Sequence, residues 1–484
     1  MEIFSRFVGS MKIKSNSTKP SKHGGKRRSN PSIHNDETED IFTSSEENKQ
    51  PDRHNYSRPH FLNLSEQEEK ASRDHNSRPI IVPNDSSRIP LQAGYAECIN
   101  GGKSQNNEDQ AAVGSFILSH HPNGLVDSTR KMDIIEVQYF AIFDGHAGVG
   151  AALMAADQLI NHLQEKLAEI QEDLFNLHMK EATQFNPKEV GRTSSLVTLD
   201  SLVRGALEAA FMSFDEHIGV ERKSFNISGG CAAIVTLILL GRVYVAHAGD
   251  CRAVAYVEEE VIELASEFTP ETDAERIQYL AHICPSLTHD AFSENYFLTH
   301  PNKKDIGNKV LCRGPLRAGW FYKVVTEEDV YRPPIIAGQG KWARLMGVIG
   351  VARGFGDHGL VVSGSKIKVK PFLSPIPEVR VFNLMDYKFG EDDVIVMGCD
   401  GLWDMLKNDQ VGSTLKSSLA KSREENITDK YRKAAEDLVL LARGDNTGKG
   451  WKMKDGKEAS FDDISCFVIP LQRCLNKSLK CYAQ

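Results

Sequence analysis

The feature of this sequence that most constrains its fold is a recurring pattern in which a short apolar run is bounded by acidic residues. The run at 138–143 leads directly into Asp144-Gly145, and the run at 394–399 leads into Asp400-Gly401. Other acidic residues flank strand-like runs in the same way: Glu108, Asp109, Asp250, Asp462 and Asp463. Short β-branched runs of this kind are typical of buried strands. The pattern therefore predicts a buried sheet with carboxylates gathered at one end.

A single Asp-Gly pair after a strand is more often a solvated turn than a ligand. Several carboxylates at one end of a sheet would, however, repel one another strongly unless cations neutralised them. Ligation by oxygens alone favours Mg²⁺ or Mn²⁺ over zinc. Two such ions about 3.5–4 Å apart would bind a phosphate and bridge an activated water for in-line displacement. His146, which follows Asp144 closely, would then protonate the leaving oxygen, or else merely cap the next helix.

Spacing excludes several other chemistries. Gly145, Gly148 and Gly150 lie between a strand and a helix, but their order, G-x-x-G-x-G, differs from the dinucleotide fingerprint. The sequence also lacks a cysteine-phosphatase motif, a G-x-S-x-G elbow and a P-loop. A net charge of −8 argues against nucleic acid as a partner. A two-metal hydrolase acting on a phosphodiester would need a basic track that the acidic core does not offer.

The secondary-structure patterns predict an α+β fold of layered sheets and helices. Strand-like runs occur in groups with helices between the groups, which disfavours a doubly wound parallel sheet. The expected strands are 138–143, 232–240, 242–246, 253–257, 378–382, 394–397 and 464–469, and the expected helices are 151–174, 202–214 and 431–443. Gly241 is expected to form a tight hairpin turn. The stretch 267–346 is too long for a plain loop and is expected to fold as an insertion over one edge.

Composition divides the chain into three regions. Residues 1–90 are expected to be largely disordered, because residues 12 to about 60 carry too little aliphatic surface to offset chain entropy. Residues 91–470 form the expected folded domain, and residues 471–484 a C-terminal tail. An odd number of cysteines without a C-x-x-C pair, and the lack of a secretory signal, predict a cytoplasmic protein with reduced cysteines.

The two ends of the chain carry membrane-related patterns. Residues 1–14 begin with an amphipathic stretch, and a basic run extends it to residue 28. Lipid would order this segment and anionic headgroups would attract its lysines, so peripheral membrane contact through 1–28 is one expectation, and a disordered or domain-docked end is the other. The last four residues, Cys481-Tyr-Ala-Gln484, have the outline of a prenylation box with an unsuitable second position.

Seven motifs occur in a fixed order along the chain. They are Asn107-Glu-Asp, Phe143-Asp-Gly-His-Ala-Gly, Ser228-Gly-Gly-Cys-Ala, Ala248-Gly-Asp-Cys-Arg, Gly350-Val-Ala-Arg-Gly-Phe-Gly-Asp, Cys399-Asp-Gly-Leu-Trp-Asp and Asp462-Asp-Ile-Ser. Together they resemble the metal-dependent (type 2C) protein serine/threonine phosphatases. The resemblance covers residues 94–470, and the segments at 94–100, 226–231 and 267–272 are similar to the H/J/M branch of that family.

This resemblance implies a four-layer α-β-β-α sandwich with a flap at 267–346, where substrate choice is expected. It also implies hydrolysis of phosphoserine and phosphothreonine in phosphoproteins by a metal-activated water, with two Mg²⁺ or Mn²⁺ ions per subunit and no covalent phosphoenzyme. By this resemblance, Asp144 would bridge both ions, the Gly145 carbonyl would bind one of them, and Asp400 and Asp462 would hold the other. Glu108 and Asp109 would orient metal-bound waters, and His146 would be the general acid. Asp250 and Asp404 would belong to a weaker third metal site.

Two positions depart from the family pattern. An arginine that binds substrate phosphate is replaced by Ser104, and the neighbouring Lys103 would serve only as a point charge. The final Asp-Asn motif reads Asp462-Asp463, so the ligand is assigned to Asp462 and the role of Asp463 stays open. The missing arginine supports an alternative, a pseudophosphatase that keeps the fold as an interaction module. The intact acidic set and His146 argue against that alternative.

Overall fold

The computed structural model describes residues 56–120, 133–183, 197–258, 260–317, 319–448 and 450–482. All of them fall within one compact unit, Pro51–Gln484. The N-terminal segment 1–28, for which membrane contact was one of two expectations, lies outside the described residues, as does the side chain of Cys481. No helix among the described residues is both long enough and apolar enough to cross a bilayer.

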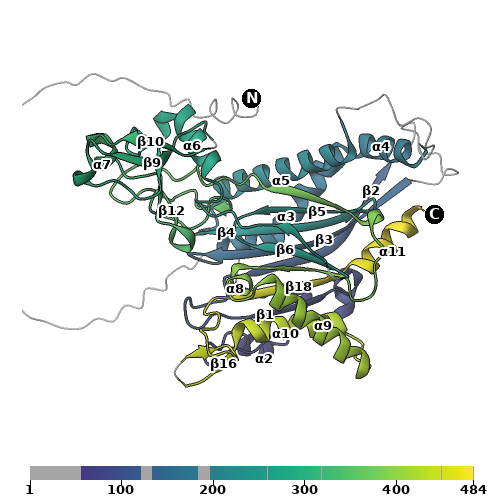
Figure 1. The fold of residues 1–484 in the computed structure, drawn as a ribbon. Coiled ribbons are helices and arrows are strands. Elements are labelled where there is room, and N and C mark those ends of the chain that lie inside the picture. Colours follow the sequence, from purple (N-terminus) through teal and green to yellow (C-terminus); the bar gives the residue numbers. More distant parts are fainter. Residues whose placement is uncertain are drawn as a thin grey trace, which may run out of the picture. The chain divides into compact units, whose positions relative to one another are not determined.

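Two antiparallel sheets form the centre of this unit (Figure 1). The first has the strand order β1 (Gly94–Cys98), β18 (Ile464–Pro470), β15 (Val394–Gly398), β6 (Arg252–Val257) and β7 (Glu260–Ala265). The second has the order β14 (Glu378–Asn383), β5 (Arg242–Ala248), β4 (Gly230–Leu239), β3 (Asp133–His146) and β2 (Gln110–His120), with β13 (Phe355–Gly356) paired to β4. Every predicted strand overlaps one of these.

Alternation along β3 shows how the layers are built. Tyr139, Ala141 and Phe143 point into a core shared with helices, whereas Phe140 and Ile142 point into the core between the two sheets. A strand that is apolar on both faces has to be covered on both sides. This explains why the run reads as continuously apolar rather than alternating.

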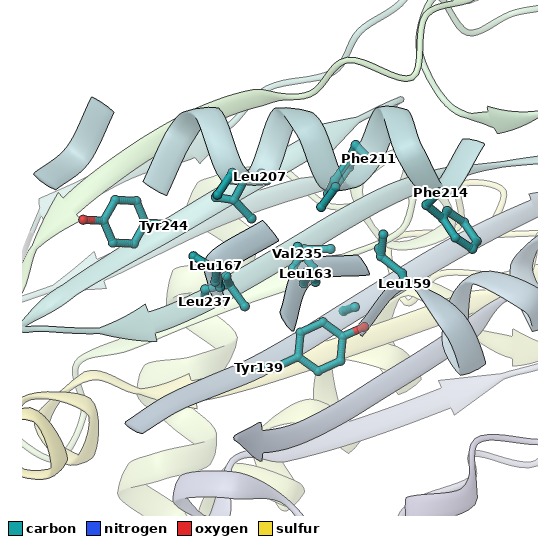
Figure 2. Close-up of a cluster of buried hydrophobic side chains, with 14 of the residues drawn as sticks. Tyr139, Leu159, Leu163, Leu167, Leu207, Phe211, Phe214, Val235, Leu237 and Tyr244 are labelled. Carbon is teal, nitrogen blue, oxygen red and sulfur yellow. The ribbon is translucent and has the colours of Figure 1, made fainter. Parts of the chain in front are cut away.

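Helices cover the outer face of each sheet. On the second sheet lie α3 (Gly150–Glu169), α4 (Gln171–Thr183) and α5 (Leu199–Glu221), and on the first lie α9 (Asn408–Glu424) and α10 (Lys430–Arg443). Figure 2 shows Leu159, Leu163 and Leu167 of α3 beside Leu207 and Phe211 of α5. The order of layers is therefore helix, sheet, sheet, helix, which confirms the predicted α+β sandwich. The helix expected at 151–174 is divided at residue 170 between α3 and α4.

The turn at Gly241 is confirmed. Leu240 and Gly241 join β4 to β5, with φ angles of 49° and 72°. Positive φ at both central residues defines the turn that matches the twist of a two-residue hairpin, and glycine accepts it without strain.

The flap has a core of its own. It contains α6 (Ala274–Ile283), β8 (Tyr296–Phe297), β9 (Lys309–Arg313), β10 (Phe321–Val324), α7 (Glu327–Tyr331), β11 (Ile336–Ala337) and β12 (Arg344–Leu345). Ile277, Ile336 and Leu345 are buried together with Val369 and Phe372. The flap core thus continues past the predicted boundary at residue 346, because residues up to Leu373 complete its packing.

Residues 56–90 differ from the prediction of a largely disordered region. They include η1 (His60–Leu62) and α2 (Glu66–Ala71), and Leu62 is fully buried. Arg58 forms a two-pronged ion pair with Glu97 of β1, at 2.7 and 2.6 Å, and Tyr95 donates to the same carboxylate. Composition did not predict the ordered structure of residues 56–90, because a few buried side chains, rather than a continuous apolar face, hold the segment against the domain.

Residues 471–484 were predicted to be a tail, but α11 (Leu471–Tyr482) occupies most of this stretch. Leu471 and Cys474 are fully buried in the core between the sheets, together with Phe467. The helix therefore belongs to the folded domain.

Replacing Glu97 with glutamine tests the buried ion pair. Glu97→Gln leaves the Arg58 guanidinium buried without a counter-charge, which is expected to lower the free energy of unfolding by about 3–5 kcal/mol. The matched control is Glu69→Gln, which breaks an exposed pair with Arg73 and should cost less than about 1 kcal/mol. Urea denaturation measures both values. Equal losses in the two variants would contradict the assigned burial.

Candidate active site

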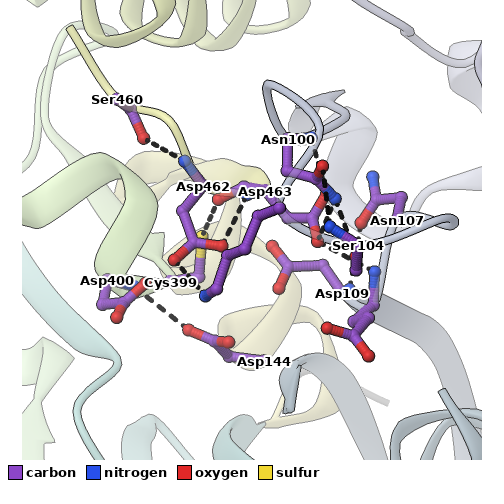
Figure 3. Close-up of polar contacts among 12 residues, drawn as sticks. Asn100, Ser104, Asn107, Asp109, Asp144, Cys399, Asp400, Ser460, Asp462 and Asp463 are labelled. Atoms are coloured by element: carbon purple, nitrogen blue, oxygen red, sulfur yellow. Dashed lines mark hydrogen bonds and ion pairs between the residues drawn. The ribbon is translucent and has the colours of Figure 1, made fainter. Parts of the chain in front are cut away.

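Strand ends from both sheets meet at one place. Asp144 lies near the end of β3, and Asp400 begins α8 (Asp400–Trp403) directly after β15. The backbone N–H of Asp400 donates to Oδ2 of Asp144 over 3.4 Å, and Asp109 and Asp144 offer ligand atoms within 4.8 Å of each other. Figure 3 shows these residues with Asp462 and Asp463 in one cluster. The structure brings together the carboxylates that the sequence singled out.

Crowding and burial make these carboxylates hard to ionise. Burial, followed by the charges of Asp400 and Asp109, raises the pKa of Asp144 well above its usual value. Burial also raises the pKa of Asp400 strongly, and the charges of Asp250 and Asp462 add to it. Burial is the main reason that the pKa of Asp109 rises to about 8. The charge of Lys103 lowers the pKa of Asp400 but does not offset burial and the neighbouring carboxylates.

The donor set fits a divalent cation held by oxygens. Oδ2 of Asp109 is buried with no hydrogen-bond partner among the described residues. Cys399 lies in the same cluster, but burial raises the pKa of its thiol well above the usual value, and its sulfur accepts from the Ser465 N–H at 3.1 Å. A protonated thiol is a poor metal ligand. Carboxylates and carbonyls remain as donors, which are the groups that hard cations prefer.

The turn after β3 lies close against Glu108. A Cβ at position 145 would lie 2.3 Å from the Glu108 backbone oxygen, so only glycine fits there. The Gly148 N–H, on a residue with φ of 126°, donates to Oε1 of Glu108 over 2.7 Å. Gly145 and Glu108, both assigned to the metal site by resemblance, are thus packed together by the backbone.

His146 is held by a residue to which the sequence analysis gave no role. Its Nε2 lies 2.8 Å from Oδ2 of Asp357. Burial lowers the pKa of His146, but the hydrogen bond to Asp357 and the charge of that carboxylate outweigh burial, so the net shift is upward. A carboxylate bonded to one ring nitrogen fixes the orientation of an imidazole. The sequence could have indicated Asp357 as a functional residue, because it is the last residue of the motif at 350–357.

The two departures from the family pattern have structural outcomes. Lys103 Nζ lies 2.5 Å from Oδ2 of Asp462, so the residue predicted to bind phosphate is paired with a predicted metal ligand. Ser104 turns into its own loop, where its hydroxyl donates to the Asn106 carbonyl at 2.7 Å and accepts from the Asn100 side chain at 2.9 Å. Ser104 therefore does not stand in for the missing arginine.

Asp463 organises the loop that carries Glu108. Its Oδ1 accepts from the Asn100 N–H at 2.8 Å, and its Oδ2 accepts from the Glu108 N–H at 2.9 Å. Burial raises the pKa of Asp463 to about 6, although these two N–H groups favour the ionised form. The role left open by the sequence is thus one of positioning.

Two buried arginines from the N-terminal segment brace the loops that carry the acids. Arg58 Nη1 donates to the Asp109 carbonyl at 2.9 Å. Arg78, which is fully buried, donates to the carbonyls of Ile99, Ser460 and Asp462 at 2.6, 2.6 and 2.9 Å. Neither role was predicted, because residues 1–90 were expected to be largely disordered.

The residues assigned to a third metal, Asp250 and Asp404, both raise the pKa of Asp400 through their charges. Burial raises the pKa of Asp250, between β5 and β6, to about 6, and the charge of Asp404 contributes. Asp404 forms an ion pair with Lys341 of the flap at 2.6 Å. The flap therefore contacts the site through a carboxylate.

Known proteins of one family are similar to this chain. A family model described as Protein phosphatase 2C matches residues 105–278 and 336–449. Protein phosphatase 1H of Homo sapiens is 39% identical over 446 residues, covering 81% of this chain and 86% of the relative. Protein phosphatase 1J of Mus musculus is 40% identical over 408 residues, covering 80% of each chain. A solved structure, the crystal structure of serine-threonine phosphatase 2C from Toxoplasma gondii, covers 81% of this chain and 99% of that chain at 17% identity, with a TM-score of 0.40.

The chain belongs to the protein phosphatase 2C family. It is a serine/threonine protein phosphatase, and the relatives 1H and 1J confirm the predicted resemblance. The matched ranges leave out 279–335, which lies in the flap, and they begin after Arg58 and Arg78.

The raised carboxylate pKa values predict how stability depends on pH. Asp109 has a pKa of about 8 in the folded chain, against an ordinary value of 3.8, so the folded state binds more protons than the unfolded state between these limits. The free energy of unfolding therefore falls as pH rises through this window. With EDTA present, Tm should fall by several degrees between about pH 5 and pH 8.

Added Mn²⁺ should flatten this dependence, because a bound cation favours the ionised carboxylates. Differential scanning calorimetry over pH, with and without Mn²⁺, makes the comparison. Asp109→Asn should weaken the slope in EDTA. A Tm that rises with pH in EDTA would oppose the assignment.

Proposed function

We propose that this phosphatase depends on Mg²⁺ or Mn²⁺ and hydrolyses phosphoserine and phosphothreonine in phosphoproteins by direct attack of water. The observation that supports it most is the crowding of Asp144, Asp400 and Asp109, whose pKa values are raised by burial and by neighbouring carboxylates. When bound, two divalent cations supply the charge and Lewis acidity that binds phosphate and activates water. Asp144, the Gly145 carbonyl, Asp400 and Asp462 are the groups that would hold them.

The remaining residues divide the work of positioning and proton transfer. Glu108 and Asp109 are placed to orient water, since Glu108 is fixed by the Gly148 N–H and Asp109 has an unused buried oxygen. His146 donates a proton to the leaving alkoxide oxygen, and Asp357 holds its ring for that transfer. Cys399 offers no thiolate at neutral pH, which favours direct attack over a covalent cysteine intermediate.

The rival proposal is a pseudophosphatase. Its support is the position of Lys103, which pairs with Asp462, together with the inward turn of Ser104. Against it stands the cost of keeping several buried carboxylates together without a chemical use for them. The two proposals differ in whether divalent cations promote phosphate release.

Release of phosphate from a phosphothreonine peptide, measured with and without Mn²⁺, decides between them. Wild type should require Mn²⁺, and Asp144→Ala should abolish the stimulation because the shared ligand is lost. His146→Ala should lower kcat on the peptide by about 100-fold or more, since general acid catalysis contributes that much. On p-nitrophenyl phosphate its loss should be smaller, because nitrophenolate leaves without a proton.

The control is His282→Ala, an exposed histidine of the flap that pairs with Glu294 and should leave the rate unchanged. Inactive wild type that binds no Mn²⁺ in calorimetry would favour the pseudophosphatase.

The pH profile tests the pairing of His146 with Asp357. A general acid must be protonated, so kcat falls as pH rises through the pKa of His146. The Asp357 carboxylate raises that pKa, hence Asp357→Asn should move the alkaline limb of the kcat profile to lower pH, on the order of one pH unit. An unchanged limb would show that another group controls it.

A further inference from the structure

A cavity of about 260 Å³ lies beside the partner of His146. Asp357, Arg222 and Ser228 are among its lining residues. Ile227 and Ser228 also line a neighbouring cavity of about 330 Å³, which is bounded by Glu108 and Gly148. The first cavity therefore flanks the reaction centre without being part of it.

Arg222 contributes an uncompensated positive charge to this cavity. It is the half-buried C-cap of α5, and its Nη1 lies 3.0 Å from the point that a Cβ on Gly359 would occupy. Its guanidinium makes no hydrogen bond or ion pair with another residue of the described ranges. By contrast, Arg276 and Arg353 both pair with Asp273.

The other charged groups of the lining already have partners. Asp357 is bonded to His146, and His358 Nε2 lies 2.8 Å from the backbone oxygen of Asp215. Asp215 is buried, and its carboxylate pairs with Lys370 at 2.7 Å. Asp357 and His358 therefore already have partners, and the charged side chain of the lining that has none among the described residues is Arg222.

The position at which the family pattern has a phosphate-binding arginine carries no guanidinium in this sequence. Ser104 replaces the arginine expected there and turns into its loop, and Lys103 is paired with Asp462. A planar guanidinium binds carboxylate or phosphoryl groups through two parallel hydrogen bonds, which a lysine does not do. Arg222 would offer such a group to an anionic side chain of the substrate from the lining of the first cavity.

We propose that this cavity is a subsite for an anionic side chain of the phosphoprotein substrate, recognised by Arg222. The proposal rests on the proposed function. The ligand is a carboxylate or a second phosphoryl group close in sequence to the residue being dephosphorylated. Arg222 is then a specificity-determining residue, because it contacts the substrate away from the reacting phosphorus and selects the sequence around it.

The test compares kcat/KM on phosphothreonine peptides that differ at one flanking position. Each flanking position is filled in turn with Glu, Gln or phosphoserine, and the ratio of kcat/KM between the Glu and Gln peptides is the readout. A partly exposed charge-assisted contact predicts that wild type prefers Glu by about fivefold to tenfold at one position. Arg222→Gln should bring that ratio to one, and Arg222→Lys should leave an intermediate ratio because charge remains without the fork.

Lys223→Gln is the matched control, since Lys223 is the exposed neighbour of Arg222 and does not line the cavity. It should keep both the activity and the ratio of wild type. A ratio near one in wild type, or equal loss of preference in Lys223→Gln, would overturn the subsite. The phosphoserine arm tells a second phosphoryl group from a carboxylate as the better ligand.

Wild-type turnover of p-nitrophenyl phosphate separates this inference from the proposed function. This small substrate carries no side chain beside its phosphate group, so its turnover reports on the metal centre without the proposed subsite contact. If the wild type hydrolyses p-nitrophenyl phosphate but shows no Glu preference on the phosphothreonine peptides, only the subsite is refuted. Absence of Mn²⁺-dependent turnover of p-nitrophenyl phosphate refutes the proposed function, and with it the subsite that rests on that function.

Discussion

Buried carboxylates repel one another, and at the junction of the two sheets the charges of Asp109 and Asp400 raise the cost of ionising Asp144. A fold tolerates such a cluster only if backbone and cationic groups hold it against that repulsion. The sandwich provides this support because the strands that end in acids are apolar on both faces and are therefore clamped between two cores. The packing of the two sheets therefore fixes the positions of the acidic residues at the strand ends.

The loops around the cluster depend on one another through buried polar side chains. Asp463 joins the Asn100 and Glu108 backbones, and Arg58 and Arg78 hold carbonyls in the loops on either side. On the opposite side, Asp215 secures the segment that presents Asp357 to His146. Each of these contacts joins residues distant in sequence, so the site is assembled only when both sheets have formed.

Local patterns predicted the strands, the hairpin at Gly241 and the principal acids, because strand ends and apolar runs are visible within a few residues. These patterns did not predict elements that contain few apolar residues. Helix α9 buries only one narrow stripe, at Val411, Leu415 and Leu419, between many polar residues. The anchoring roles of Arg58 and Asp357 escaped prediction because they depend on partners far along the chain, which periodicity does not reveal.

The two anchoring arginines also bear on how the domain should be delimited. The family-matched residues begin at 105, whereas Arg58 and Arg78 lie well before that point and bond to the loops that carry Asp109 and Asp462. The family model therefore covers less of the chain than the contacts that hold the acidic loops in place. A fragment of residues 105–484 would retain every acidic ligand and yet lack Arg58 and Arg78, whose side chains hold the loops that carry them.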